Sequence, residues 1–258
     1  MEFTHDDLLE SAIAAGWAAA RVLDDWSRRF TVSEKSPANL VTEADFESQR
    51  AIHELLRARY PEHRFLGEEG LSDEGPAPYR WIIDPLDGTS NYVHGFPYYA
   101  VSIGVEHEGE LIAGVILDPT RKELFAAARG RGATLNGEPI RPSRAERLNE
   151  ALVMVSLPVA VKPGHPAVER FVRTMSAAQA TQRTGSAALN LAYTACGRID
   201  AFFSTSLRPW DMAAGALIVR EAGGRVSQIG GGTFDVEAPD ILATNGTALH
   251  EELRQLLR

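Results

Sequence analysis

The stretch from Trp81 to Asn91, which reads WIIDPLDGTSN, places the strongest constraint on how this chain folds. Its three leading apolar residues predict a short strand, and the Pro-Leu-Asp-Gly that follows predicts a turn. Asp84 and Asp87 lie three residues apart in that turn, and Gly88 and Thr89 indicate a helix start. Carboxylates bind hard cations, and the free N–H groups of a helix start bind phosphate oxygens. By itself the stretch is compatible with metal-assisted chemistry on a phosphate and with a plain surface turn.

The composition of the chain limits the partners and the compartment that can be expected for it. The 258 residues include 26 Lys and Arg against 35 Asp and Glu, a net charge of −9 without any basic run, so nucleic-acid binding is not expected. No apolar run approaches the roughly 18 residues of a membrane span, and no signal peptide is apparent at the start. A single cysteine, Cys196, allows no intramolecular disulfide and fits a cytoplasmic protein. An acidic protein that handles an anionic substrate needs a local cation, which a bound metal would supply.

The spacing of apolar residues divides the chain into two halves. In residues 1–145, helices are predicted over about 5–29 and 43–60, followed by hairpins from 98 to 128. This half is predicted to place two helices on a mostly antiparallel sheet. In residues 146–258, short strands alternate with helices, which predicts a mixed or parallel layer. The two halves are expected to form two packed subdomains of one α+β protein.

Acidic residues recur where a strand ends or a helix begins. Clustered acids repel one another unless a cation compensates them. Asp45 also has a structural explanation, because it stands three residues after Thr42 in a capping box. From the residues alone, capping is the favoured role for Asp45. Three acidic clusters recur in this way: Glu68 with Glu69, Asp84 with Asp87, and Asp211 after Pro209-Trp210. Asp211 by itself also suits a helix start, so the combination of the three clusters is what indicates a site.

Taken together, these stretches resemble the inositol monophosphatase family, which are Mg-dependent, lithium-sensitive sugar-phosphate phosphatases. The resemblance runs nearly end to end. It implies the layered α/β/α/β/α sugar-phosphatase fold that fructose-1,6-bisphosphatase also has, with the metal site between the two halves. The stretches that carry it are NLVTEAD at 39–45, GEE at 67–69, DPLDGTSNYVH at 84–94, GSAA at 185–188 and WDMAAG at 210–215.

The resemblance also implies a set of metal ligands. Glu68, Asp84 and the carbonyl of Leu86 would hold one Mg²⁺, and Asp84, Asp87 and Asp211 would hold a second. Glu68 would help to place a weaker third. An all-oxygen ligand set suits Mg²⁺, with Mn²⁺ as a possible substitute, better than zinc.

The implied chemistry is hydrolysis of a phosphate monoester by in-line attack of a metal-activated water. Glu68 and Thr89 would orient that water. Asp45 would be the partner of Thr89, so the resemblance favours a catalytic role for Asp45 over capping alone. Contacts to the substrate are predicted for Asp87, Gly88, Thr89, Ser90, Gly185, Ser186, Ala187 and position 204.

Position 204 departs from the family pattern. Relatives that act on inositol phosphates usually carry a glutamate there, whereas Ser204 is shorter and uncharged and cannot make the same charge-assisted hydrogen bond. Metal binding and hydrolysis should survive this change, but the preference for inositol is open. The expected partner is a small phosphorylated metabolite, and the resemblance implies a homodimer. Fructose 1,6-bisphosphate, NADP and histidinol phosphate remain alternative substrates, and a non-catalytic regulatory binding role remains an alternative function.

Overall fold

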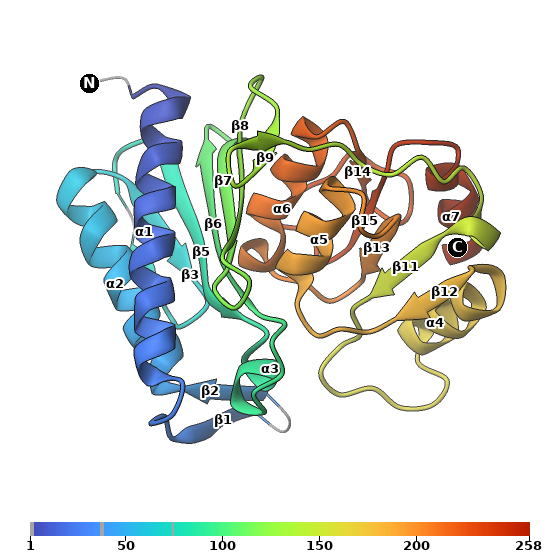
Figure 1. The fold of residues 1–258 in the computed structure, drawn as a ribbon, viewed down its shortest axis with the longest axis horizontal. Helices are drawn as coiled ribbons and strands as arrows, with labels where there is room; N and C mark the ends of the chain where they lie inside the picture. The colour runs from blue at the N-terminus through green and yellow to red at the C-terminus, as the bar shows by residue number, and fades with distance from the viewer. Residues whose placement is uncertain (1–2, 37–38, 74) are drawn as a thin grey trace.

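The computed structural model describes residues 3–36, 39–73 and 75–258. Three layers of helices alternate with two β-sheets, as Figure 1 shows. The expected α/β/α/β/α layering is therefore confirmed. No helix in the described ranges has the length and apolar character that crossing a bilayer would need.

The first helical layer consists of α1 (His5–Trp26) and α2 (Glu43–Arg59). Each begins at a threonine in a complete capping box, at Thr4 and at Thr42. The small apolar side chains of α1 recur at helical spacing and are fully buried against the neighbouring sheet. The helix ends three residues before the predicted Arg29, because Ser27 already caps it.

The large sheet has the strand order β10-β9-β8-β7-β6-β5-β3-β4. All neighbours are antiparallel except β3 and β5, so the predicted mostly antiparallel sheet is confirmed. Because β3 and β5 run parallel, their carboxyl ends meet at the same edge. The strands are β3 (Arg64–Gly67), β4 (Ser72–Asp73), β5 (Tyr79–Asp87), β6 (Ala100–His107), β7 (Glu110–Asp118), β8 (Glu123–Ala128), β9 (Ala133–Leu135) and β10 (Glu138–Pro139).

The small sheet has the order β12-β11-β13-β15-β14. Strand β11 pairs in parallel with β12 and β13, whereas β15 pairs antiparallel with β13 and β14. The predicted mixed layer is confirmed. A 3₁₀ turn, η1 (Leu148–Glu150), leads into this sheet, whose strands are β11 (Leu152–Val155), β12 (Ala180–Gln182), β13 (Ala201–Ser204), β14 (Arg225–Ser227) and β15 (Ile241–Thr244).

Helices α5 (Ala187–Ala195) and α6 (Pro209–Glu221) lie between the two sheets, and α4 (Pro166–Ala177) and α7 (Leu249–Leu257) cover the outer face of the small sheet (Figure 1). Gly104 in β6 and Gly114 in β7 let α6 approach the large sheet closely. A Cβ at Gly104 would lie 2.8 Å from the Ala213 Cβ. Residues of both halves share this central core. The expected boundary at residue 145 falls between β10 and η1, and the division into two subdomains remains a prediction.

A short hairpin precedes α2, formed by β1 (Val32–Ser36) and β2 (Asn39–Thr42). The sequence analysis interpreted residues 35–39 as a loop, which is wrong for 35, 36 and 39, while 37 and 38 lie outside the described residues. Residues 32–35 of the first strand are exposed and lack the alternation of a half-buried strand, so their pattern gave no signal.

Candidate metal centre

The candidate residues gather at the edge of the large sheet where β3 and β5 end side by side. Helix α6 packs on β5, β6 and β7, and it begins beside this edge. Two adjoining cavities of about 590 and 470 Å³ open there. Glu68, Asp87 and Asp211 line both cavities, so residues from both halves of the chain meet at one place.

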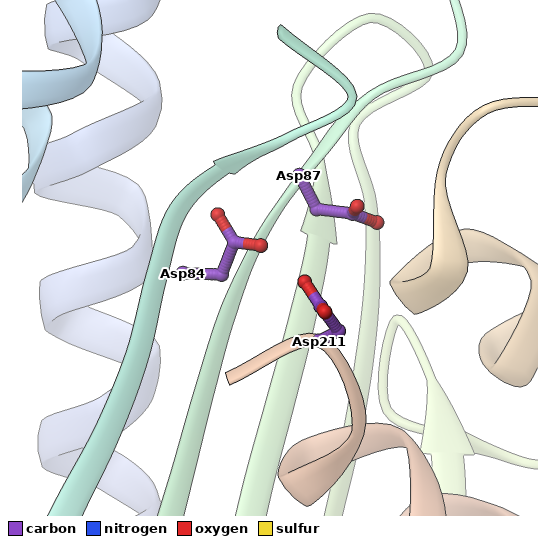
Figure 2. Close-up of side chains that lie close together, drawn as sticks. All are labelled: Asp84, Asp87 and Asp211. Carbon is purple, nitrogen blue, oxygen red and sulfur yellow. The ribbon is translucent and has the colours of Figure 1, made fainter. Parts of the chain in front are cut away.

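Three aspartates form the centre of this site. One carboxylate oxygen from each of Asp84, Asp87 and Asp211 lies within 4.8 Å of the others. Figure 2 shows the three side chains turned toward one another, two from the end of β5 and one from the start of α6. The predicted meeting of these acids, which lie up to 127 positions apart in the sequence, is present in the structure.

A bulge in β5 explains how two acids three positions apart reach the same spot. In a regular strand, residues i and i+3 point to opposite faces. The pairing of β5 with β6 shifts register between Asp84 and Asp87, where Pro85 and Leu86 together stand opposite the single residue Val101. The Leu86 N–H donates to Asp84 Oδ1 at 3.0 Å and holds the first carboxylate in place. The stiff Pro-Leu turn thus re-aims both carboxylates.

The other two acids are oriented by helix starts. Ser186 Oγ and the Ala188 N–H, at the start of α5, donate to Asp87 Oδ2 at 2.5 and 2.7 Å. The Arg208 N–H donates to Asp211 Oδ2 at 2.7 Å, as in half of a capping box. In each case these donors hold one oxygen of the carboxylate, so the second oxygen can bind a ligand.

The electrostatics of the cluster are unfavourable without a cation. Burial, together with the neighbouring carboxylates, raises the pKa of Asp84 and of Asp211 well above the ordinary value. Burial also raises the pKa of Asp87 to about 6, although Ser186 and Ala188 oppose the shift. Buried acids that repel one another are stabilised by a cation among them. The donor set is all oxygen, so these residues fit Mg²⁺ or Mn²⁺.

Glu68 lines the cavities but is not one of the three mutually close acids. Its carboxylate pairs with Lys35 Nζ at 2.9 Å, and Lys35 also contacts Glu69 at 2.6 Å. Burial opposes the charge of Lys35, but the two glutamates outweigh it and raise the lysine pKa. Burial raises the pKa of Glu69 to about 7. Lys35 therefore lies at the edge of the site and offsets part of the negative charge of Glu68.

Asp45 has both of the contacts that were considered for it. Its Oδ2 accepts from the Thr42 N–H at 2.8 Å and from Thr42 Oγ1 at 2.7 Å, which caps α2. Its Oδ1 accepts from Thr89 Oγ1 at 3.0 Å, and the same hydroxyl lies 3.2 Å from the Leu86 carbonyl oxygen. Capping and the contact with Thr89 therefore coexist, since each uses a different oxygen.

The glycines beside the acids allow a close approach of backbone. Gly88 adopts φ 98°, and a Cβ there would lie 3.1 Å from the Tyr98 carbonyl oxygen. Thr89 then begins the short helix α3 (Thr89–Val93). Gly185 has φ 89°, and a Cβ there would lie 3.1 Å from Asn91 Nδ2. The residues predicted to touch substrate that line a cavity are Asp87, Gly88, Thr89, Ser90, Gly185 and Ala187.

Two of the three serines predicted to touch substrate, Ser186 and Ser204, are buried. Ser186 is fully buried and donates to Asp87, so its hydroxyl orients an acid. Ser204 is 1% exposed in β13, where its hydroxyl lies 3.3 Å from the Ser156 carbonyl oxygen. Among the described residues, neither is a cavity-lining residue, and their predicted contacts with substrate remain predictions.

Two cavity-lining arginines and one buried amide were not predicted from the sequence. Arg183 lines both cavities and Arg208 lines one of them. Each lies two positions before a recognised motif, and this position is the signal that could have indicated them. Gln49 on α2 contacts the backbone beside Glu68, and its one-turn spacing from Asp45 was the available hint.

Comparison with known proteins identifies the family. A profile of the inositol monophosphatase family matches residues 5–258. The chain is 43% identical over 221 residues to Nus factor SuhB of Pseudomonas aeruginosa, covering 83% of this chain and 82% of that protein. It is 41% identical over 251 residues to an inositol-1-monophosphatase of Synechocystis sp., covering 96% and 86%.

A solved structure gives the same result for the fold. The extragenic suppressor protein suhB from Bartonella henselae superposes with a TM-score of 0.92 at 38% identity, covering 97% of this chain and 98% of that chain. The fold and the sequence agree along nearly the whole chain. This chain belongs to the inositol monophosphatase family, and the predicted assignment as a phosphoric monoester hydrolase is confirmed.

Proposed function

We propose that the chain is a Mg²⁺-dependent phosphomonoesterase for a small polyol or sugar phosphate of the inositol monophosphate kind. The observation that carries the proposal is the group of three mutually close aspartates, of which Asp84 and Asp87 are buried and Asp211 is half-buried, beside a cavity lined by Gly88, Thr89 and Ser90. A cation among the acids and a phosphate against the helix start would satisfy both features.

The proposed ligands are the three aspartates together with Glu68 and the carbonyl of Leu86. Asp84, Leu86 and Asp87 lie on one bulged segment, and Glu68 follows the neighbouring parallel strand. Asp211 comes from the opposite half of the chain. When bound, divalent cations would lower the pKa of a water molecule and stabilise the charge of the leaving oxygen.

The chain's own residues would orient the reactants. Thr89 Oγ1 donates its hydrogen to Asp45 Oδ1, which leaves the lone pairs of Thr89 Oγ1 free to accept a hydrogen bond from the attacking water. Glu68 would hold the same water from the other side. The first N–H groups of α3 would cradle the phosphate, since a helix start leaves these groups without intrahelical partners. Attack would then proceed in line with the leaving oxygen.

The substrate class rests on the family and on the cavity. Relatives carry the name inositol-1-monophosphatase, which supports an inositol phosphate. Arg183 and Arg208 add positive charge to the cavity wall and favour an anionic ligand. Ser204 provides no charge for hydroxyl recognition, so we expect a broader substrate range than strict preference for inositol.

Phosphate release tests the proposal directly. The substrates are inositol 1-phosphate, fructose 1,6-bisphosphate, NADP, histidinol phosphate and 2-glycerophosphate, each assayed with Mg²⁺, with Mg²⁺ plus Li⁺, and with a chelator. We expect turnover that requires Mg²⁺ and falls with Li⁺. The Asp211→Asn variant should be inactive, whereas Asp25→Asn, a change to an exposed acid of α1, should match the wild type. Turnover that persists in chelator would refute the proposed chemistry.

A regulatory binding role is the second candidate, because a relative with 43% identity is named a Nus factor. Such a role would not require the metal cluster. Absence of turnover on every substrate, in a chain that still binds Mg²⁺, would favour this candidate. We also propose a homodimer, which light scattering of the purified chain would test by its mass.

A further inference from the structure

One buried face of α2 contacts three separate segments of the site. Asp45, Ser48 and Gln49 stand at helix positions i, i+3 and i+4, so their side chains share a face. Asp45 accepts from Thr89, as described above. Ser48 Oγ donates to the Pro85 carbonyl oxygen at 3.0 Å, between the two aspartates of β5. The third residue, Gln49, reaches the segment that carries Glu68.

Gln49 holds both polar groups of one backbone residue. The Glu69 N–H donates to Gln49 Oε1 at 3.0 Å, and Gln49 Nε2 donates to the Glu69 carbonyl oxygen at 3.1 Å. A primary amide offers a donor and an acceptor at once, which a carboxylate or an ammonium group cannot do at pH 7. The side chain is 8% exposed, so water has little access to replace it.

The neighbouring residues leave the Glu68 backbone little freedom. A Cβ at Gly67 would lie 2.3 Å from Gln49 Oε1, so only glycine admits the amide at this position. The Glu68 N–H donates to the Ile83 carbonyl oxygen at 3.2 Å, directly before Asp84. Glu68 is thus attached to β5 on one side, and its successor is attached to α2 on the other.

We infer that Gln49 is a positioning residue for the metal site. It sets the direction of the Glu68 carboxylate by holding the backbone of Glu69. This inference rests on the proposed function, because it takes Glu68 as a metal ligand. Residues that hold ligands in place typically change metal affinity by about 10- to 100-fold when they are replaced. A purely structural amide would change stability without changing metal affinity.

The test measures metal binding and not only turnover. Gln49→Met removes both hydrogen bonds and keeps the length of the side chain. The matched control is Asn245→Leu, because Asn245 is a buried amide that donates to the Ala145 carbonyl oxygen at 2.8 Å and accepts from the Thr247 N–H, and it lines neither cavity of the site. Binding of Mn²⁺ is followed by the electron paramagnetic resonance signal of the free ion, and the Tm is recorded for each variant.

We expect both variants to melt at a lower temperature and only Gln49→Met to bind Mn²⁺ about tenfold more weakly. The Mg²⁺ concentration for half-maximal turnover should rise by the same factor. Unchanged Mn²⁺ affinity in Gln49→Met would overturn the inference, and so would an equal loss in Asn245→Leu. If Gln49→Met does not fold, Gln49→Asn keeps the amide but is too short to reach, and the same tenfold loss decides.

Measurements on the wild-type chain distinguish a failure of the role of Gln49 from a failure of the proposed function. Wild-type protein that binds Mn²⁺ and releases phosphate, beside an unaffected Gln49 variant, would overturn only the role of Gln49. Wild-type protein that binds no Mn²⁺ would overturn the proposed function and this inference with it.

Discussion

Asp118 and the three aspartates of the metal centre are all acids of the protein interior, but their surroundings differ. Asp118 is fully buried and accepts four hydrogen bonds, from the N–H and hydroxyl of Thr120 and from the N–H and guanidinium of Arg121. Asp84 is also buried, but among the described residues its hydrogen-bond donor is the Leu86 N–H alone. Two other carboxylates, those of Asp87 and Asp211, lie close to it.

The difference shows that burial alone does not mark a functional acid. An internal acid whose oxygens are all satisfied by the chain has a complete structural role. Acids that are buried together without matching donors destabilise the fold until something outside the chain compensates them. The metal centre is recognised by this missing compensation, and Asp118 is the internal reference against which it can be tested.

The largest expected effect is on turnover. Asp84→Asn should lower kcat by roughly a thousandfold, since metal stabilisation of the transition state supplies several kcal/mol and each 1.36 kcal/mol is tenfold. Asp118→Asn should keep kcat within about twofold, because its bonds end at a turn outside the cavities. Phosphate release at saturating Mg²⁺ measures both. Equal losses in the two variants would remove the distinction between the two kinds of acid.

The same two variants should change stability in opposite directions when a chelator is present. Asp118→Asn leaves donors of Thr120 and Arg121 unmatched and should lower the free energy of unfolding by about 2 kcal/mol. Asp84→Asn removes one of three mutually repelling charges and should raise it by about 1 kcal/mol.

Urea denaturation at pH 8 checks both signs. Mg²⁺ at a hundred times its Kd should stabilise the wild type and Asp118→Asn by about 2.7 kcal/mol. It should stabilise Asp84→Asn much less. A loss of stability in Asp84→Asn without metal would contradict the repulsion argument.

A separate effect, confined to acidic pH, concerns a buried base, His63, which is 3% exposed. Its Nδ1 accepts from the Trp81 Nε1–H at 3.0 Å, and burial lowers its pKa to about 4 from the ordinary 6.5. Between pH 6.5 and 4, His63 is therefore protonated in the unfolded chain and neutral in the folded chain. Its contribution to stability is complete above pH 6.5 and is lost as the pH falls toward 4, by on the order of 2 kcal/mol.

Urea denaturation at intervals from pH 8 to pH 4 isolates this contribution. His63→Gln should show a smaller fall in stability across the window than the wild type. His94→Gln, a change to an exposed residue of the signature stretch, should follow the wild-type curve. Parallel curves for His63→Gln and the wild type would show that protonation of His63 does not oppose folding.

Much of the architecture could be predicted because its signals are local. Capping boxes at Thr4 and Thr42 and the regular spacing of apolar residues define helices within a few residues of the chain. The hairpin turns after β6 and β7 are equally local. The β1–β2 hairpin escaped prediction because exposed polar strands have no periodic apolar face. The motifs also contain most of the cavity-lining candidates, since a family resemblance transfers residue by residue.

The sequence by itself determined the layered fold class, the family and the identity of the acids. Only the tertiary structure decided which groups compensate each acid. Lys35 beside Glu68, Ser186 beside Asp87 and Gln49 beside Glu69 are pairs separated by 20 to 99 positions. Local patterns carry no information about such pairs, because a hydrogen bond forms between whatever atoms the packed layers bring within about 3 Å. That packing left Asp118 fully satisfied and the three aspartates in need of a cation.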